Sequence, residues 1–163
     1  MSRLVCLMGV VLIGCKDDAT CEVGGLGGDA AQATIDGSDW AANGGSWSVA
    51  GSAIQVSLES ASGLTLTLRA TSDDAGDGVA DRVEAGDFPV VIDLGGEDGH
   101  GGVMDLRNGL EAYASNQEGG SGTLTISNVS GSDELSACFE FDAVRQRDGR
   151  IMEIREGQVT IGQ

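Results

Sequence analysis

Positive charge is scarce in this chain, which has 9 lysine and arginine residues against 26 aspartate and glutamate residues and a formal net charge of -17. Proteins that bind nucleic acid rely on lysine and arginine to neutralise phosphates, so this composition excludes nucleic acid as a partner. The same balance argues against a domain that lies flat on anionic lipid. Strong acidity suits a soluble domain outside the cytoplasm, and it is compatible with cation binding.

Histidine is nearly absent as well, because His100 is the only one in the chain. It lies among the glycines of residues 95–102, and no Gly-x-Ser-x-Gly elbow occurs that would supply a serine nucleophile for a catalytic triad. A transition-metal site with Glu97 and Asp98 is an alternative, although no further histidine or cysteine lies nearby. We interpret this stretch as a surface loop and expect no enzymatic function.

Aromatic residues make up only 4 % of the chain. Trp40, Trp47 and Tyr113 are candidates for a platform on which a sugar ring stacks. Large residues in a β-sandwich more often belong to the core. We therefore predict that all three pack in the core or at a turn and keep sugar stacking as the alternative.

The longest apolar run is too short to cross a bilayer as a helix. It follows Arg3 and covers the ten residues Leu4–Ile13, whereas a helical span needs about 20 apolar residues. The apolar core of an export signal needs only about 7 to 15 residues. The run therefore predicts a signal peptide.

Residues 12–15, Leu-Ile-Gly-Cys, resemble the lipobox of bacterial lipoproteins. The resemblance implies that residues 1–14 are removed, that Cys15 is lipidated, and that its acyl chains hold the protein on a membrane of the cell envelope. In Gram-negative lipoproteins, an aspartate directly after the lipidated cysteine tends to retain the protein in the inner membrane. Lys16 occupies that position here, so the resemblance favours the outer membrane, on its periplasmic or exterior face. Two alternatives are an ordinary signal peptide with an unrelated cysteine and a buried amino-terminal strand.

The mature chain divides into a short tether and one domain. Residues 15–31 begin with the lipidated cysteine and continue with small, polar and glycine-rich residues, which is typical of a flexible tether. Residues 32–163 have the length of a single domain.

Alternation of apolar and polar residues with a period of two dominates this domain. Residues 54–58 and 64–68 predict a hairpin with one buried face. Pro89 cannot donate to a sheet ladder, so it indicates an edge strand or a strand start. No stretch shows a helical period with helix caps. We therefore predict an all-β fold, an antiparallel β-sandwich or barrel of about 8–10 short strands with almost no helix. The further strands are predicted around residues 88–94, 104–106, 110–114, 124–126, 135–143 and 152–161.

One of these hairpins has a strong turn signal. Asn108-Gly109 predicts a two-residue turn after the strand at residues 104–106. The apolar positions of the next strand are then Leu110, Ala112 and Ala114.

The cysteines predict a disulfide once the signal is removed. Cys6 leaves with the signal and Cys15 is taken by lipid, so Cys21 and Cys138 remain. The phenylalanines of residues 135–143 are expected to face inward, which places Cys138 on the outer face, within reach of the tether. Two thiols in an oxidising compartment predict a bridge that closes a long loop. The alternative is that both stay free.

Four short motifs resemble, in their order, those of uncharacterised bacterial lipoproteins that have a single all-β domain. The motifs are residues 33–40, 84–88, 122–126 and 135–143. The resemblance covers most of the mature chain and implies the same fold. That family carries no assigned activity.

An acidic stretch at residues 73–84 is the sharpest candidate for binding chemistry. It is similar to a twelve-residue calcium loop, in which carboxylates and one backbone carbonyl surround a hard cation. Ala75 stands where a ligand belongs, and the flanking residues predict strands instead of helices. We favour a solvated acidic loop and keep a Ca²⁺ site as the alternative, closer to thrombospondin type 3 repeats, with the ligands Asp73, Asp77, Asp81 and Glu84.

These observations predict a non-enzymatic, lipid-anchored envelope or surface lipoprotein whose domain is a binding or structural module for a protein or glycan partner. The alternative is a calcium-stabilised adhesive or carbohydrate-binding β domain. An enzyme ranks third, and we expect no cofactor other than Ca²⁺.

Overall fold

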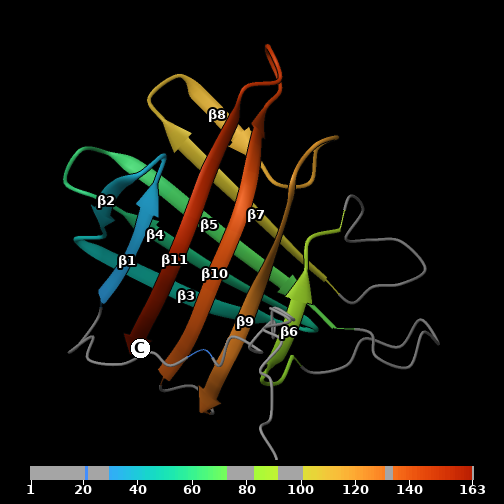
Figure 1. The fold of residues 1–163 in the computed structure, drawn as a ribbon. Helices are drawn as coiled ribbons and strands as arrows, with labels where there is room; N and C mark the ends of the chain where they lie inside the picture. The colour runs from blue at the N-terminus through green and yellow to red at the C-terminus, as the bar shows by residue number, and fades with distance from the viewer. Residues whose placement is uncertain (1–20, 22–29, 73–82, 92–100, 131–133, 163) are drawn as a thin grey trace, which may run out of the picture.

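A computed structural model describes Cys21 and residues 30–72, 83–91, 101–130 and 134–162. These residues form an all-β fold, as predicted, in which one antiparallel sheet curls into a half-barrel (Figure 1). Eleven strands and no helix occur in this part of the chain: β1 (Ala30–Ile35), β2 (Ser38–Ala41), β3 (Gly44–Ala50), β4 (Ala53–Glu59), β5 (Leu64–Thr71), β6 (Gly86–Pro89), β7 (Gly101–Asn108), β8 (Glu111–Ala114), β9 (Ser121–Ser130), β10 (Glu134–Arg145) and β11 (Ile151–Gly162).

The curled sheet makes two layers that face each other across the core. β1, β11, β10, β9 and β6 lie in front in Figure 1, and β3, β4, β5 and β7 lie behind them. β10 connects the layers, because its residues 134–142 pair with β9 whereas Val144 and Arg145 pair with β8. β8 in turn pairs with β7, and the order then continues through β5 and β4 to β3. The front and rear layers are therefore parts of one sheet.

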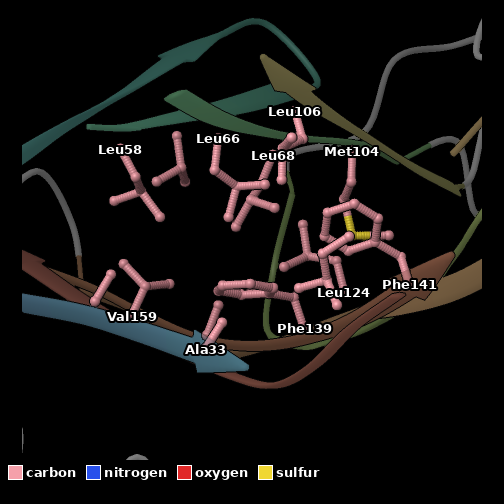
Figure 2. Packing of buried hydrophobic residues seen from close by; sticks show 14 of the residues in the cluster. Ala33, Leu58, Leu66, Leu68, Met104, Leu106, Leu124, Phe139, Phe141 and Val159 are labelled. Carbon is pink, nitrogen blue, oxygen red and sulfur yellow. The ribbon is translucent and has the colours of Figure 1, made fainter. Parts of the chain in front are cut away.

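Alternating side chains from both layers fill the space between them. Leu66 and Leu68 of β5 face Phe139 and Phe141 of β10 across the core, and all four are buried (Figure 2). Burying an apolar side chain of this size stabilises a fold by about 1.5–3 kcal/mol. The period of two along each strand is therefore what builds the core.

The predicted hairpin of β4 and β5 is present. Leu58 pairs with Leu66, so the apolar positions of the two strands lie on the same face. Gly63 in the turn has a φ of +78°, which glycine adopts without a steric penalty.

The hairpin of β7 and β8 corrects a prediction. Asn108 pairs with Glu111, so the two turn residues are Gly109 and Leu110 and not Asn108 and Gly109. A shift of one residue turns every side chain of the following strand to the opposite face. Leu110 is therefore exposed, and Tyr113 is buried in place of the alanines on either side of it.

A bulge in β11 explains a change of phase in the sequence. The buried positions are Met152 and Ile154 before the bulge and Val159 and Ile161 after it, although the strand is continuous. The register against β10 shifts at this point, and Glu156 has a φ of +54°. One extra residue in the strand restores the inward direction of the apolar side chains.

The first three strands have no counterpart among the strands predicted from alternation. β1 begins at Ala30, so the last two residues of the predicted tether belong to a strand, and Ala31 is buried. Pro89 lies at the end of β6, which pairs with β9 alone among the described strands, as an edge strand does.

Candidate functional site

The disulfide joins the amino-terminal segment to the front layer. Cys21 and Cys138 are bonded, with their Cα atoms 5.5 Å apart and 117 positions apart in the chain. Cys138 is half-buried on the outer face of β10, next to the outward-facing Glu140, while Phe139 points into the core. The structure thus contains the predicted pair on the predicted face.

Charge pairs hold the outer face near this bridge. Arg155 of β11 donates to Asp142 of β10 at 2.5 Å and to the carbonyl of Phe141 at 3.0 Å. The hydrogen bond to Asp142 raises the pKa of Arg155 above its ordinary value, against a smaller opposing effect of desolvation. Because the guanidinium is used to join two strands, we assign it a structural role.

A second charged group lies where β10 meets β8. Arg145 donates to both carboxylate oxygens of Asp148, at 2.8 and 2.6 Å, and also pairs with Glu111. Its guanidinium carbon lies 5.6 Å from the centre of the Tyr113 ring, within the range of a cation–π contact. The hydrogen bond from Arg145 lowers the pKa of Asp148 below its ordinary value. These side chains bind one another, which indicates that the group stabilises the strand ends.

A shallow groove of about 520 Å³ lies on β3, β4 and Thr65 of β5. Small residues line most of it, among them Gly44 and Ser46 of β3 and Ser57 of β4. Glu59 is its only ionisable lining residue, and it pairs directly with Gly44. Since Gly44 has no side chain, no side chain at that position separates the Glu59 carboxylate from the edge of β3 that pairs with no described strand.

Most of the predicted calcium loop lies outside the described residues. Asp73, Asp77 and Asp81 are not among them, nor is His100. Glu84 is described, and it is exposed just before β6. In the part of the chain that the structure describes, no group of three or more histidine, cysteine or acidic side chains is placed to hold a metal ion. The calcium loop stays a prediction from the sequence.

Cys15 and the rest of the lipobox also lie outside the described residues. Lipidation therefore stays a prediction too.

The three large aromatic residues belong to the core, as predicted. Trp40 is 8 % exposed, Trp47 6 % and Tyr113 2 %. A sugar ring needs an exposed aromatic face, so the alternative of a stacking platform at these residues is wrong.

The groove on β3 was not predicted from the sequence. Its signal is the run Asn43-Gly44-Gly45-Ser46, which alternation does not identify as a strand because it has no large apolar residue before Trp47. The two glycines differ in role: a Cβ at Gly45 would lie 2.7 Å from Leu58 and 2.9 Å from Ile161 in the core, whereas a Cβ at Gly44 meets no atom within 4 Å. Only Gly44 therefore marks a place where another chain can approach the outer face of the strand.

Comparisons with known proteins assign no relative, because no family model, curated protein or solved structure matches the chain. Across the described ranges, no helix has the length and apolar character needed to cross a membrane. Since no relative is known from these comparisons, the functional proposal for the chain depends on its own residues.

Proposed function

We propose that the chain is a non-enzymatic bacterial lipoprotein, anchored in the cell envelope through lipid on Cys15, whose β domain is a binding module for a partner outside the cytoplasm. The observation that carries the proposal is the Cys21–Cys138 bridge, six residues after the lipobox cysteine. Structural disulfides form and persist in oxidising compartments such as the periplasm. The bridge, the predicted export signal and the predicted lipobox thus all support a location in the cell envelope, outside the cytoplasm.

The bridge also shortens the tether. Without it, the domain would begin at β1, some fifteen residues after the anchor, or roughly 50 Å of extended chain. With it, only the six residues from Cys15 to Cys21 separate the anchor from β10, a span of at most about 20 Å. The proposed tether then attaches to the outer face of β10 in the front layer, whereas β3, which lines the groove, belongs to the rear layer (Figure 1 shows the two layers).

Mass analysis of the membrane fraction tests the anchor. We expect a chain that starts at Cys15 and carries the added mass of the acyl chains. Replacing Cys15 with serine should leave the chain uncleaved and without lipid, whereas the matched replacement of Cys6, inside the signal, should change neither. Unmodified Cys15, or residues 1–14 still attached in the membrane fraction, would overturn the proposal.

A calcium-stabilised adhesive domain is the second candidate, and the spacing of Asp73, Asp77, Asp81 and Glu84 is the observation that favours it. Ca²⁺ at 100 times its dissociation constant should add about 2.7 kcal/mol to the stability of the fold. Thermal melts with Ca²⁺, with Mg²⁺ and with a chelator measure this effect, and the Asp77→Asn variant should lose it. An unchanged melting temperature would remove this candidate.

A further inference from the structure

β2 and β3 are the two ends of the strand order among the described strands, and only one of these edges lacks protection. β2 is four residues long and contains Asp39. The short β6 is no such end, because the chain continues from it into a bridge between Val90 and Gly102 of β7, and it contains Pro89. Short length, charge and proline are the features by which proteins prevent another strand from pairing with an edge. β3 has seven residues, Gly-Gly-Ser-Trp-Ser-Val-Ala, with neither a charge nor a proline.

The hydrogen-bond pattern shows which groups of β3 face outward from the sheet. Ser60 N donates to Leu64 O and Ser72 N to Ser52 O, so the even-numbered residues of β4 bond to β5. Bonding to the two neighbours alternates along a strand, so the odd-numbered residues of β4 bond to β3. Their partners on β3 are even-numbered. The backbone N–H and C=O groups of Gly45, Trp47 and Val49 therefore point away from β4, toward the open edge.

The groove lies directly beside this edge. An added strand would lie about 4.8 Å from β3 and about 9.6 Å from β4. A long side chain from that strand can pass over Gly44, which has no side chain, and reach the carboxylate of Glu59 in the groove. No hydrogen bond or ion pair holds the Glu59 side chain within the described part of the chain.

We propose that the edge of β3 accepts an extended segment of a partner protein as an additional strand, and that a lysine or arginine of this segment binds Glu59. Main-chain hydrogen bonds to Gly45, Trp47 and Val49 supply affinity in this mode of recognition, and the groove supplies specificity. The formal charge of -17 attracts a cationic segment and repels a second copy of the same chain. This inference rests on the proposed function as a binding module.

A capped peptide of seven alternating threonine and lysine residues is the probe, with glutamate and serine versions of the same length as controls. The protein is the full chain in detergent, and the measurement is NMR of backbone amides at up to roughly 1 mM peptide. We expect the lysine peptide to protect the amides of Gly45, Trp47 and Val49 from exchange, and the glutamate peptide to protect none of them. No protection by the lysine peptide would overturn the proposal.

Two pairs of variants separate strand addition from nonspecific attraction by the acidic surface. Val49→Pro removes the backbone N–H of residue 49, which points to the open edge and makes no ladder bond to β4. The side chain of Val49 is 45 % exposed, so the replacement does not disturb the core. We expect binding to weaken at least about tenfold, whereas Val49→Thr keeps it. Gly44→Val should block the path to Glu59 with the fold intact, since a Cβ there meets no atom within 4 Å. Its matched control is Gly86→Val on β6, where a Cβ is equally free.

The charge of Glu59 gives the last comparison. Glu59→Gln should weaken the lysine peptide several-fold and leave the serine peptide unchanged, and the exposed Glu118→Gln should affect neither. Equal binding by wild type, Val49→Pro and Gly44→Val would overturn the proposal. So would concentration-dependent protection of these amides without peptide, because the occupant would then be a second copy. Peptide binding is measured whether or not Cys15 carries lipid, so failure of the anchor and failure of the edge are distinguishable.

Discussion

Tyr113 is the only tyrosine of the chain, and its environment shows how a single side chain can be both core and polar partner. The ring is 2 % exposed, while the hydroxyl donates to Glu111 at 3.2 Å. Arg145 lies over the ring. Burial and then the hydrogen bond to Glu111 raise the pKa of Tyr113 above 10.0, and the charge of Arg145 opposes them. The folded chain therefore keeps this proton at a pH where the unfolded chain releases it.

We predict that Tyr113 ionises at a higher pH in the folded chain than in urea, where its pKa is close to 10.0. Absorbance of the tyrosinate near 295 nm measures this without interference from another tyrosine. Because the folded-state pKa is raised, the contribution of Tyr113 to stability should be constant below about pH 10 and be lost as the pH rises further. Urea unfolding of Tyr113→Phe should lack this part of the alkaline loss. Identical titration curves in buffer and in urea would contradict the assignment.

At the scale of one element, β11 depends on a glycine beside its bulge. A Cβ at Gly157 would lie 2.3 Å from the ring of Phe139 and 2.5 Å from the Phe139 carbonyl oxygen. Phe139 is buried in the core and cannot move away without disturbing its neighbours. The ring thus packs directly against the backbone of β11, and only glycine permits this distance.

We predict that Gly157→Ala lowers the free energy of unfolding by about 2–4 kcal/mol, because the added methyl group overpacks the core. Gly86→Ala is the matched control on β6, where a Cβ meets nothing within 4 Å, and it should change stability by less than about 0.5 kcal/mol. Urea unfolding monitored by tryptophan fluorescence measures both. A Gly157→Ala variant as stable as its control would show that the ring of Phe139 has another place to go.

At the scale of the whole molecule, one covalent bond joins the amino-terminal segment to a strand near the other end of the chain. The bridge closes a loop of 117 positions that includes β1 to β9. In the chain-entropy account, a loop of this size restricts the unfolded chain by about 4–5 kcal/mol. The same bond sets the distance between the proposed anchor and β10.

We predict that the double variant Cys21→Ser, Cys138→Ser loses about 3–5 kcal/mol in urea unfolding and keeps its β-sheet spectrum without denaturant. Reduction of the wild-type chain should produce the same loss, which serves as the control for the substitutions themselves. An unchanged unfolding midpoint after complete reduction would contradict the prediction.

Alternation in the sequence was sufficient to predict the strands with large apolar residues. Leu66 and Leu68, and likewise Phe139 and Phe141, face the core because neighbouring side chains of a strand point to opposite sides. The outward direction of Cys138 followed from the same rule. β1 was not predicted, because its buried positions include Ala31 and Ala33, and alanine carries too little apolar surface to produce a clear period.

The candidate site was harder to predict than the fold. The run from Asn43 to Ser46 resembles a loop in composition, and only pairing with β4 makes it a strand with a groove beside it. Glu59 is one acidic residue among 26, and nothing local distinguishes it. Its position opposite Gly44 is a property of the register between two strands.

The amino-acid sequence by itself was sufficient to predict the all-β fold of the described residues and the buried apolar residues of the strongly alternating strands, because both follow from local period. It also predicted the pair Cys21 and Cys138, by an elimination that depends on the proposed removal of the signal and lipidation of Cys15. Only the tertiary structure decided that Leu110 is exposed, that β3 is the unprotected edge, and that Glu59 faces an open groove. These depend on register and on strand order, which are set by contacts between residues far apart in the chain.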